Sequence, residues 1–329
     1  MKAGVPRAYI LGLRAGDNTE IRLEGATGVS ARTRSSVPRF TAALAAAGVL
    51  AATLTACGSA HAGSPVPNGG DVAAYVGSKF DDTLAGIADQ LNRNETRKTR
   101  IDTVVRFDEK RINQTISAVQ VGHPPARLSR NHSNIRSEEY LDSFHPANSP
   151  VEYLHLGPLY APLAPTPWVQ LPYTAGQYNE CFWEGMQGVC KLLGSMQTSA
   201  ESGRATKSAN RKPDGSVELV SDVTLSAFIE EDVVTFPPSI EDELTADMKA
   251  QTFRTSVLLD PQGKLNDIRM QGKVTGNGHE LEVDIHFRLD GTPSENDLPK
   301  VPDPAQVTVI SDSAAINDFY ARMGQIQGG

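Results

Sequence analysis

The stretch LEVDIHFRL (residues 281–289) decides the fold class of this 329-residue chain. Its apolar side chains alternate strictly with charged or polar ones. Because successive side chains of a strand point to opposite faces of a sheet, this period of two predicts a strand with one buried and one wet face. Strands of that kind belong to antiparallel sheets.

Turn signals and further alternating segments surround this strand. Gly276-Asn277-Gly278 immediately precedes it, and Asp260-Pro261-Gln262-Gly263 joins TFRTSVLL to KLNDIRMQGKV, which predicts a hairpin. Residues 217–225 alternate as well, with Val217, Leu219, Val223 and Leu225 as the apolar set. Shorter strand-like pieces are expected at residues 100–108, 112–121, 135–144, 151–156 and 167–172.

Three helices are expected around these strands. Residues 71–93 carry apolar side chains at three- and four-residue steps, which predicts one amphipathic helix. Pro237-Pro238-Ser239 begins a second helix, and Ser313 caps a third. The buried stripe of the second helix is Ile240, Leu244 and Met248, and that of the third is Ile316, Phe319, Tyr320 and Met323. Residues 196–215 are expected to be a loop. The predicted class is α+β, a curved antiparallel sheet or half-barrel packed on two or three helices, in one domain over residues 71–325.

The N-terminal region predicts export. FTAALAAAGVLAATL (residues 40–54) has no charge and follows Arg32, Arg34 and Arg39, as in a signal peptide. It is shorter than the ~20 apolar residues that cross a bilayer as a helix. Translation from about Val29 would give a signal segment of ordinary length.

The residues that end this segment, Leu54-Thr55-Ala56-Cys57, resemble the lipobox of bacterial lipoproteins. The resemblance implies that residues 1–56 are an extension plus signal peptide, and that Cys57 is diacylated and becomes the mature N-terminus. The alternative is a buried cysteine in an alanine-rich helix. Residues 57–70 are small, polar and rich in Pro and Gly, which predicts a flexible tether. We therefore expect a protein anchored by lipid on the extracytoplasmic face of the cell membrane.

Charge excludes one class of partner. The chain carries 31 basic and 39 acidic side chains, a net of −8, and removal of residues 1–56 leaves 24 against 36. A domain this acidic is not a nucleic-acid binder, and acyl chains rather than surface charge must hold it to a membrane.

The remaining cysteines, Cys181 and Cys190, are an even pair in an oxidising compartment, so we expect a disulfide. Half of a metal site, or two free buried thiols, are the alternatives.

Catalytic and metal motifs are missing from the sequence. It contains no HExxH, GxSxG, GxxxxGK[ST] or CxxC, and its histidines are scattered. We expect no catalytic residue, no metal and no cofactor. Seven aromatic residues fall between Tyr153 and Trp183, which indicates a core, the mouth of an apolar pocket, or a sugar-stacking surface.

The order of these elements resembles a known family. Thr166-Pro167-Trp168-Val169, the capped helix, the DPQGKL hairpin (residues 260–265) and the proline-rich approach to an edge are similar to the LppX/LprG-type lipoproteins of actinobacteria. That resemblance implies a half-barrel sheet over helices with an apolar cavity for lipids. A cavity of this kind needs inward aliphatic side chains, because exposing an acyl chain to water costs ~0.8 kcal/mol per CH₂. The residues expected to line it are Val223, Leu225, Met270, Val283, Ile285 and Phe287, with Trp168 nearby.

The predicted function is a membrane-anchored lipoprotein that binds or carries a lipid or another apolar ligand. Its expected partners are that ligand, the membrane and an envelope protein. Plain core packing is the alternative for each lining residue. An envelope interaction module with a filled core is the alternative function, and an enzyme with a dispersed site is the third.

Overall fold

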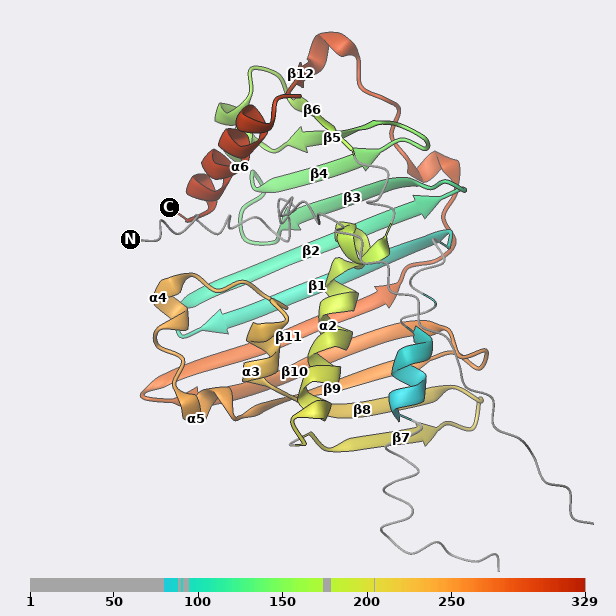
Figure 1. The fold of residues 1–329 in the computed structure, drawn as a ribbon, viewed down its shortest axis with the longest axis vertical. Coiled ribbons are helices and arrows are strands. Elements are labelled where there is room, and N and C mark those ends of the chain that lie inside the picture. Colours follow the sequence, from blue (N-terminus) through green and yellow to red (C-terminus); the bar gives the residue numbers. More distant parts are fainter. Residues whose placement is uncertain (1–79, 88–89, 91–94, 174–178, 204, 329) are drawn as a thin grey trace, which may run out of the picture. The chain divides into compact units, whose positions relative to one another are not determined.

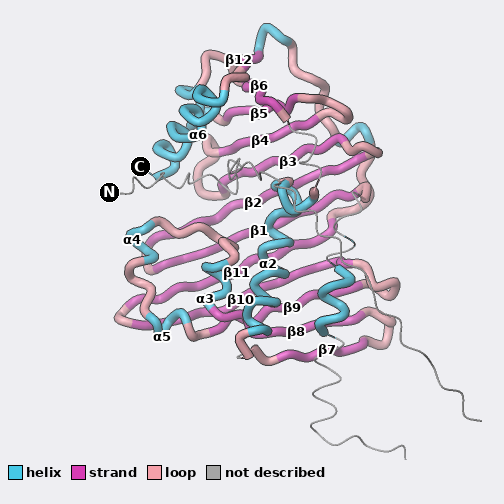
Figure 2. Tube along the Cα trace, viewed as in Figure 1, coloured by secondary structure: helices cyan, strands magenta, loops and turns pink. Residues whose placement is uncertain are grey.

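One unclosed sheet of twelve strands forms the centre of the fold (Figure 1). The computed structural model describes residues 80–328 except 88–89, 91–94, 174–178 and 204. The strands lie in the order β12-β6-β5-β4-β3-β2-β1-β11-β10-β9-β8-β7, and Figure 2 shows β12 and β7 at the two edges. All neighbours are antiparallel except β12 and β6, which are parallel. The predicted α+β class, a curved and mainly antiparallel half-barrel sheet, is confirmed.

Two groups of strands build this sheet, one from each half of the chain. The first group is β1 (Arg97–Phe107), β2 (Lys110–Val121), β3 (Ala126–Ser133), β4 (Tyr140–His145), β5 (Val151–Leu156) and β6 (Trp168–Pro172). The second group is β7 (Lys207–Arg211), β8 (Val217–Thr224), β9 (Thr252–Leu259), β10 (Leu265–Gly276), β11 (His279–Leu289) and β12 (Val307–Val309). The pairing of β1 with β11 joins the two groups, and β12 alone leaves its group to pair with β6 at the other edge of the sheet.

Helices lie between and beyond these strands. They are η1 (Pro158–Leu163), η3 (Glu180–Phe182), α2 (Glu184–Glu201), α3 (Leu225–Glu230), α4 (Pro238–Glu241), α5 (Ala246–Lys249), η4 (Glu295–Asp297), η5 (Pro304–Gln306) and α6 (Ser313–Gly328). Residues 80–87 and Gln90 are helical too, and they are the described part of the helix predicted over residues 71–93. No helix within the described residues is both long and apolar enough to span a bilayer.

The strand predictions of the second half are confirmed closely. The LEVDIHFRL stretch lies in β11 with Leu281, Val283, Ile285 and Phe287 buried, whereas Leu289 at the strand end is exposed. The two predicted turns connect β9 to β10 and β10 to β11. In the first half, the predicted strand at residues 135–144 begins later, at Tyr140, and β3 was not predicted.

The helix predictions need correction at three places. Residues 196–215 are not a loop, because α2 continues to Glu201 and β7 follows. The helix that starts at Pro238 is two short helices, α4 and α5, although Ile240, Leu244 and Met248 are all buried as predicted. The cap of α6 is Asp312, whose Oδ1 accepts hydrogen bonds from the backbone N–H groups of Ala314 and Ala315.

Two apolar clusters cover one face of the sheet, which we call the helix face. The larger cluster joins β1 and β8–β11 to α2, α3 and α5. The smaller one joins β4–β6 to η1 and α6, through buried side chains that include Phe319 and Met323. Both lie on the same face, because the register runs straight across the strands from Ile101 through Ile116, Asn131 and Leu141 to Leu156. All of the described residues belong to one compact unit of the chain.

Candidate functional site

The six aliphatic and aromatic residues predicted to line a cavity come together on the helix face. Five belong to β8, β10 and β11, and Leu225 begins α3. Met270 lies opposite Ile285, and the next rows along the sheet contain Val283 and Phe287. All six are at most 1% exposed and share the larger apolar cluster. In this structure they form a packed layer beneath helices.

Helix α2 is the main cover of this layer. It contacts β3, β2, β1, β10 and β8, so it crosses the sheet rather than following one strand (Figure 1). Its apolar side chains in the larger cluster are Met186, Val189, Leu192, Leu193 and Met196.

Polar contacts hold both ends of α2 to the sheet. At its start, Glu184 accepts hydrogen bonds from Ser129 Oγ at 2.8 Å and from Asn131 Nδ2 at 2.6 Å. At its end, Ser199 Oγ accepts a 3.0 Å hydrogen bond from the backbone N–H of Thr224 in β8. The helix is therefore tied to two strands that lie far apart in the sheet.

Glycines allow α2 to approach the sheet closely. A Cβ at Gly185 would lie 2.5 Å from the Cβ of Ala118, and a Cβ at Gly188 would lie 2.8 Å from Cδ1 of Ile101. Both separations are shorter than real carbon contacts, so a larger residue would push the helix away from β1 and β2.

Trp168 does not lie with the six predicted lining residues. It lies in β6 next to Val169, which points to the helix face and packs in the smaller cluster. Successive side chains of a strand alternate, so Trp168 points to the opposite face, which we call the outer face. There its ring stacks on His155 with centroids 4.5 Å apart.

A polar row crosses the helix face at one end of strands β1 to β5, from the side of the larger apolar cluster to that of the smaller one. Cross-strand pairing in β1 to β4 places Arg97, Gln120, Arg127 and His145 side by side, and Glu152 of β5 continues the row. Arg127 Nε donates to Gln120 Oε1 at 2.7 Å, and Gln120 Nε2 donates to Glu180 Oε1 of η3 at 2.9 Å. Arg97 forms an ion pair with Glu180 at 3.0 Å. No sequence pattern marks this row, because its members come from five separate strands.

Three glutamic acids in or beside this row have raised pKa values. Burial, opposed by the hydrogen bonds from Asn131 and Ser129, raises the pKa of Glu184 to about 7. Burial and the nearby Glu184 carboxyl raise the pKa of Glu152 to about 7. Burial also raises the pKa of Glu180 and lowers that of His145. The start of α2 therefore carries one carboxyl group, and lies near a second, whose charge changes near neutral pH.

The predicted disulfide is present between Cys181 and Cys190. It joins η3 to the second turn of α2, so these two elements are covalently linked where they pack on the polar row.

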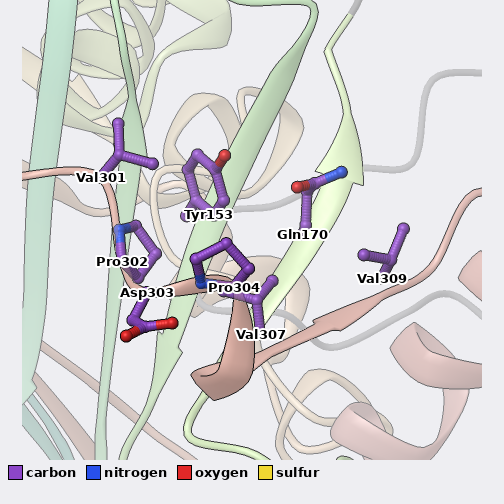
Figure 3. A pocket seen from close by; sticks show the side chains of 8 residues that line it. All are labelled: Tyr153, Gln170, Val301, Pro302, Asp303, Pro304, Val307 and Val309. Atoms are coloured by element: carbon purple, nitrogen blue, oxygen red, sulfur yellow. The ribbon is translucent and has the colours of Figure 1, made fainter.

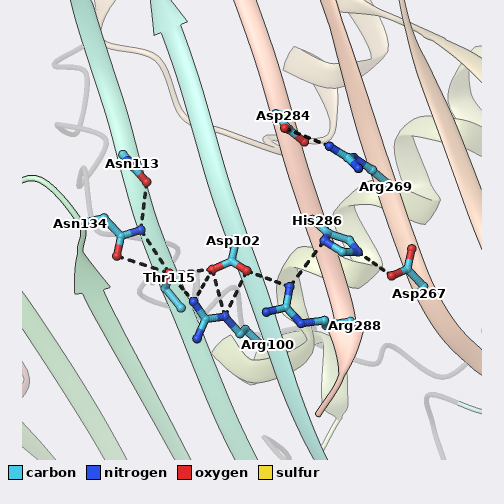
Figure 4. A network of polar contacts seen from close by, with 10 residues as sticks. All are labelled: Arg100, Asp102, Asn113, Thr115, Asn134, Asp267, Arg269, Asp284, His286 and Arg288. Carbon is cyan, nitrogen blue, oxygen red and sulfur yellow. Dashed lines mark hydrogen bonds and ion pairs between the residues drawn. The ribbon is translucent and has the colours of Figure 1, made fainter.

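The outer face differs between its two halves. Over β1, β2, β10 and β11 it carries paired charges, shown in Figure 4, in which Asp102 contacts both Arg100 and Arg288 and Asp267 contacts His286. Opposite charges balance within this network, and its members are partly exposed, so it solubilises the face rather than forming a charged patch.

A groove of about 580 Å³ lies on the other half of the outer face (Figure 3). The segment 301–304 crosses over β5, β6 and β12 there. The groove is lined by Tyr153, Gln170, Val301, Pro302, Asp303, Pro304, Val307 and Val309. Asp303 is already used as a cap, since its Oδ1 accepts from the backbone N–H of Ala305.

The remaining site predictions concern lipid and metal. Leu54, Thr55, Ala56 and Cys57 lie outside the described residues. Within the described part of the chain, no three His, Cys, Asp or Glu side chains are grouped so that they could hold a metal ion.

Structural neighbours were found, whereas sequence relatives were not. No family model matches the chain, and no curated protein matches it significantly. LprF from Mycobacterium bovis is 8% identical to this chain, with a TM-score of 0.34. The match covers 69% of this chain and 97% of the LprF chain. The lipoprotein LppX from Mycobacterium tuberculosis is 11% identical to this chain, with a TM-score of 0.29. The match covers 64% of this chain and 94% of the LppX chain. A LolA superfamily protein from Nitrosomonas europaea is 9% identical to this chain, with a TM-score of 0.24. The match covers 67% of this chain and 97% of that protein's chain.

The resemblance to LppX-type lipoproteins that the sequence indicated is thus found among structural neighbours as well. These identities and TM-scores are too low to transfer a function, so the function is argued from the chain's own residues.

Proposed function

We propose that this chain is a lipid-anchored envelope lipoprotein that binds a lipid or another apolar ligand on the helix face of its sheet. The observation that supports it is the continuous apolar surface of β8–β11 and β1 on a sheet that does not close. The six predicted lining residues belong to this surface. No catalytic role is assigned to any residue.

In this proposal α2 is the element that a ligand displaces. The start of the helix rests on polar side chains, through Glu184 on β3 and through Gly185, whose carbonyl accepts a 3.1 Å hydrogen bond from Thr99 Oγ1. Polar contacts of this kind can be exchanged for contacts with water, so separating this end costs less than separating an apolar contact of equal area. A ligand that enters there replaces the side chains of α2 on the aliphatic surface.

The domain arrangement of the proposal follows the sequence. Residues 1–56 are removed, Cys57 carries the acyl chains, residues 57–70 are a tether, and the domain begins at residue 71. Two acyl chains give stable anchoring, whereas one gives only reversible binding. Membrane fractionation of the wild type and of Cys57→Ala tests this part, and retention of the variant in the membrane would contradict it.

Mass spectrometry of organic extracts tests ligand binding. The full chain carrying Cys57→Ala has no acyl anchor, so any lipid recovered from it is a bound ligand. We expect lipid in stoichiometric amount, and less of it when Met270 on the helix face is replaced by Trp. The matched control is Arg269→Trp, one residue away on the outer face, which should keep its lipid. Extracts without lipid, together with no thermal stabilisation on adding phospholipid, would overturn the proposal.

An interaction module is the second candidate, and one observation favours it. The six residues are already buried by protein, as in a filled core. Such a module would retain no lipid in the extraction experiment, and it would be stable without one.

A further inference from the structure

Two hydroxyl groups on the helix face, among residues of the larger apolar cluster, are buried without a hydrogen-bond partner in the described part of the chain. Ser221 of β8 and Thr255 of β9 are both 0% exposed, and they lie directly opposite each other in neighbouring strands. Neither Ser221 Oγ nor Thr255 Oγ1 has a partner in the part of the chain that the structure describes. Buried hydroxyls in native proteins are nearly always paired, so this pair calls for an explanation.

The surroundings of the two hydroxyls are mainly apolar. One charged side chain lies beside them, that of Lys207 opposite Ser221 in β7, and it is paired with Asp81 at 2.8 Å. The row of the two hydroxyls across the sheet continues to Met270 and then to Ile285, two of the predicted lining residues. Along their own strands, the flanking helix-face residues are Leu219, Val223, Phe253 and Val257, all 0% exposed. The pair is therefore a small polar spot on the surface assigned to the ligand.

The position of the pair under helices also fits ligand binding. Strand β8 contacts both α2 and α3, and the end of α2 is tied to it by the hydrogen bond from Thr224 to Ser199. A group bound at Ser221 and Thr255 would lie under this helical layer, away from water. There a hydrogen bond is stronger than at the surface, because the local dielectric constant is low.

We propose that Ser221 and Thr255 donate hydrogen bonds to the ester carbonyl oxygen of an acyl lipid bound on the helix face, an inference that rests on the proposed function. An ester oxygen is neutral, so it can be buried among these aliphatic side chains, whereas an ionised group would lose far more hydration than two hydroxyls return. The adjoining acyl chain would lie along Met270 and Ile285. The ligand class is thereby narrowed to ester-linked lipids.

The test compares two probes that differ only in this group. Dioctanoyl phosphatidylcholine carries two ester carbonyls, and its di-O-octyl ether analogue has none. Both are titrated by calorimetry into the full chain carrying Cys57→Ala, and into the same chain with Ser221→Ala or Thr255→Val. Thr252→Val is the matched control, because Thr252 is an exposed residue of the same strand.

We expect the wild-type face to bind the ester probe roughly tenfold more tightly than the ether, which corresponds to one good hydrogen bond. Ser221→Ala and Thr255→Val should each abolish most of this preference for the ester probe, and Thr252→Val should leave it unchanged. The two variants should also melt at a higher temperature than the parent when no lipid is present, because each removes an unpaired buried hydroxyl.

Four results would overturn the inference. If the parent bound the two probes with equal affinity, the inference would be wrong, but the proposed function would not be affected. An ester preference that persists in both variants would place the carbonyl elsewhere. Ligand-free variants that melt below the parent would show that the hydroxyls already make stabilising hydrogen bonds. Binding of neither probe would refute the proposed function itself, and the inference with it.

Discussion

Asn131 Nδ2, in the middle of the sheet, donates a 2.6 Å hydrogen bond to Oε1 of Glu184, the first residue of the helix that crosses the sheet. Both residues are buried, and Ser129 holds the other carboxyl oxygen. This contact links the docking of α2 to the protonation of one carboxyl group.

Stability should therefore depend on the charge of Glu184. Burial raises its pKa from 4.5 to about 7 in the folded chain, so between these values the folded state binds a proton that the unfolded state has lost. Its contribution to the free energy of unfolding is full below about pH 4.5 and is lost as the pH rises toward 7. Glu184→Gln keeps a neutral side chain of the same shape and removes this dependence.

Denaturant unfolding between pH 5 and pH 8 measures the effect. Relative to the wild type, Glu184→Gln should gain stability as the pH rises, by an amount on the order of 1.4 kcal/mol for each unit by which the pKa is raised. Glu109→Gln, at an exposed turn between β1 and β2, is the control and should follow the wild-type curve. Parallel curves for all three proteins would refute the link.

The disulfide should stabilise the same end of α2. Replacing Cys181 and Cys190 by Ser opens a ten-residue loop, and the chain-entropy model gives a loss of about 2–3 kcal/mol. Because the loop contains the start of α2, hydrogen exchange should accelerate there before it does in β8–β11. Uniform acceleration across the domain would contradict this order.

The buried layer of β11 should tolerate truncation poorly. Ile285→Ala removes a side chain that is 1% exposed and should cost about 2–5 kcal/mol of unfolding free energy. Asp284→Ala is the control, since Asp284 lies on the outer face in a half-exposed ion pair with Arg269 and contributes little. Equal losses for the two variants would mean that the faces of β11 are assigned wrongly.

Helix α6 should stabilise the sheet independently of the ligand face. Phe319 is 1% exposed in the smaller cluster, so Phe319→Ala should cost about 3–5 kcal/mol. Asp318→Ala, at a largely exposed position of the same helix, should cost little. Binding of dioctanoyl phosphatidylcholine should stay unchanged in Phe319→Ala below its melting temperature, and a lost affinity would place the ligand under α6 instead.

Most of the correct structural predictions rest on the alternation of apolar and polar residues along a strand. The faces of β11 follow from its own sequence, because the direction of each side chain is a property of the extended backbone. The same reason explains why five of the six residues predicted to line a cavity lie on one face of three strands. Trp168 was predicted to lie near them without such a pattern, and it lies on the other face.

Helix α2 illustrates what local patterns miss. Its sequence contains Gly185, Gly188 and Gly194, and glycine lowers helix propensity. The structure gives the reason for two of them, since Gly185 faces Ala118 and Gly188 faces Ile101 at distances that no Cβ would permit. Residues that weaken the helix locally are the ones that let it pack on the sheet.

Strand β3 was missed for a related reason. Its helix-face residues include Arg127, Ser129 and Asn131, which are buried yet polar, so no apolar alternation marks the strand. Their partners come from η3, α2 and other strands, far away in the sequence.

The sequence by itself determined the class of the sheet, the faces of its apolar strands and the pairing of Cys181 with Cys190. Only the tertiary structure decided that α2 covers the helix face, that a polar row crosses this face at one end of β1 to β5, and that Ser221 and Thr255 meet beneath the helices. Alternation within a strand is set by backbone geometry over a few residues. Contacts between strands and helices instead depend on how distant segments pair, which no short window of sequence contains.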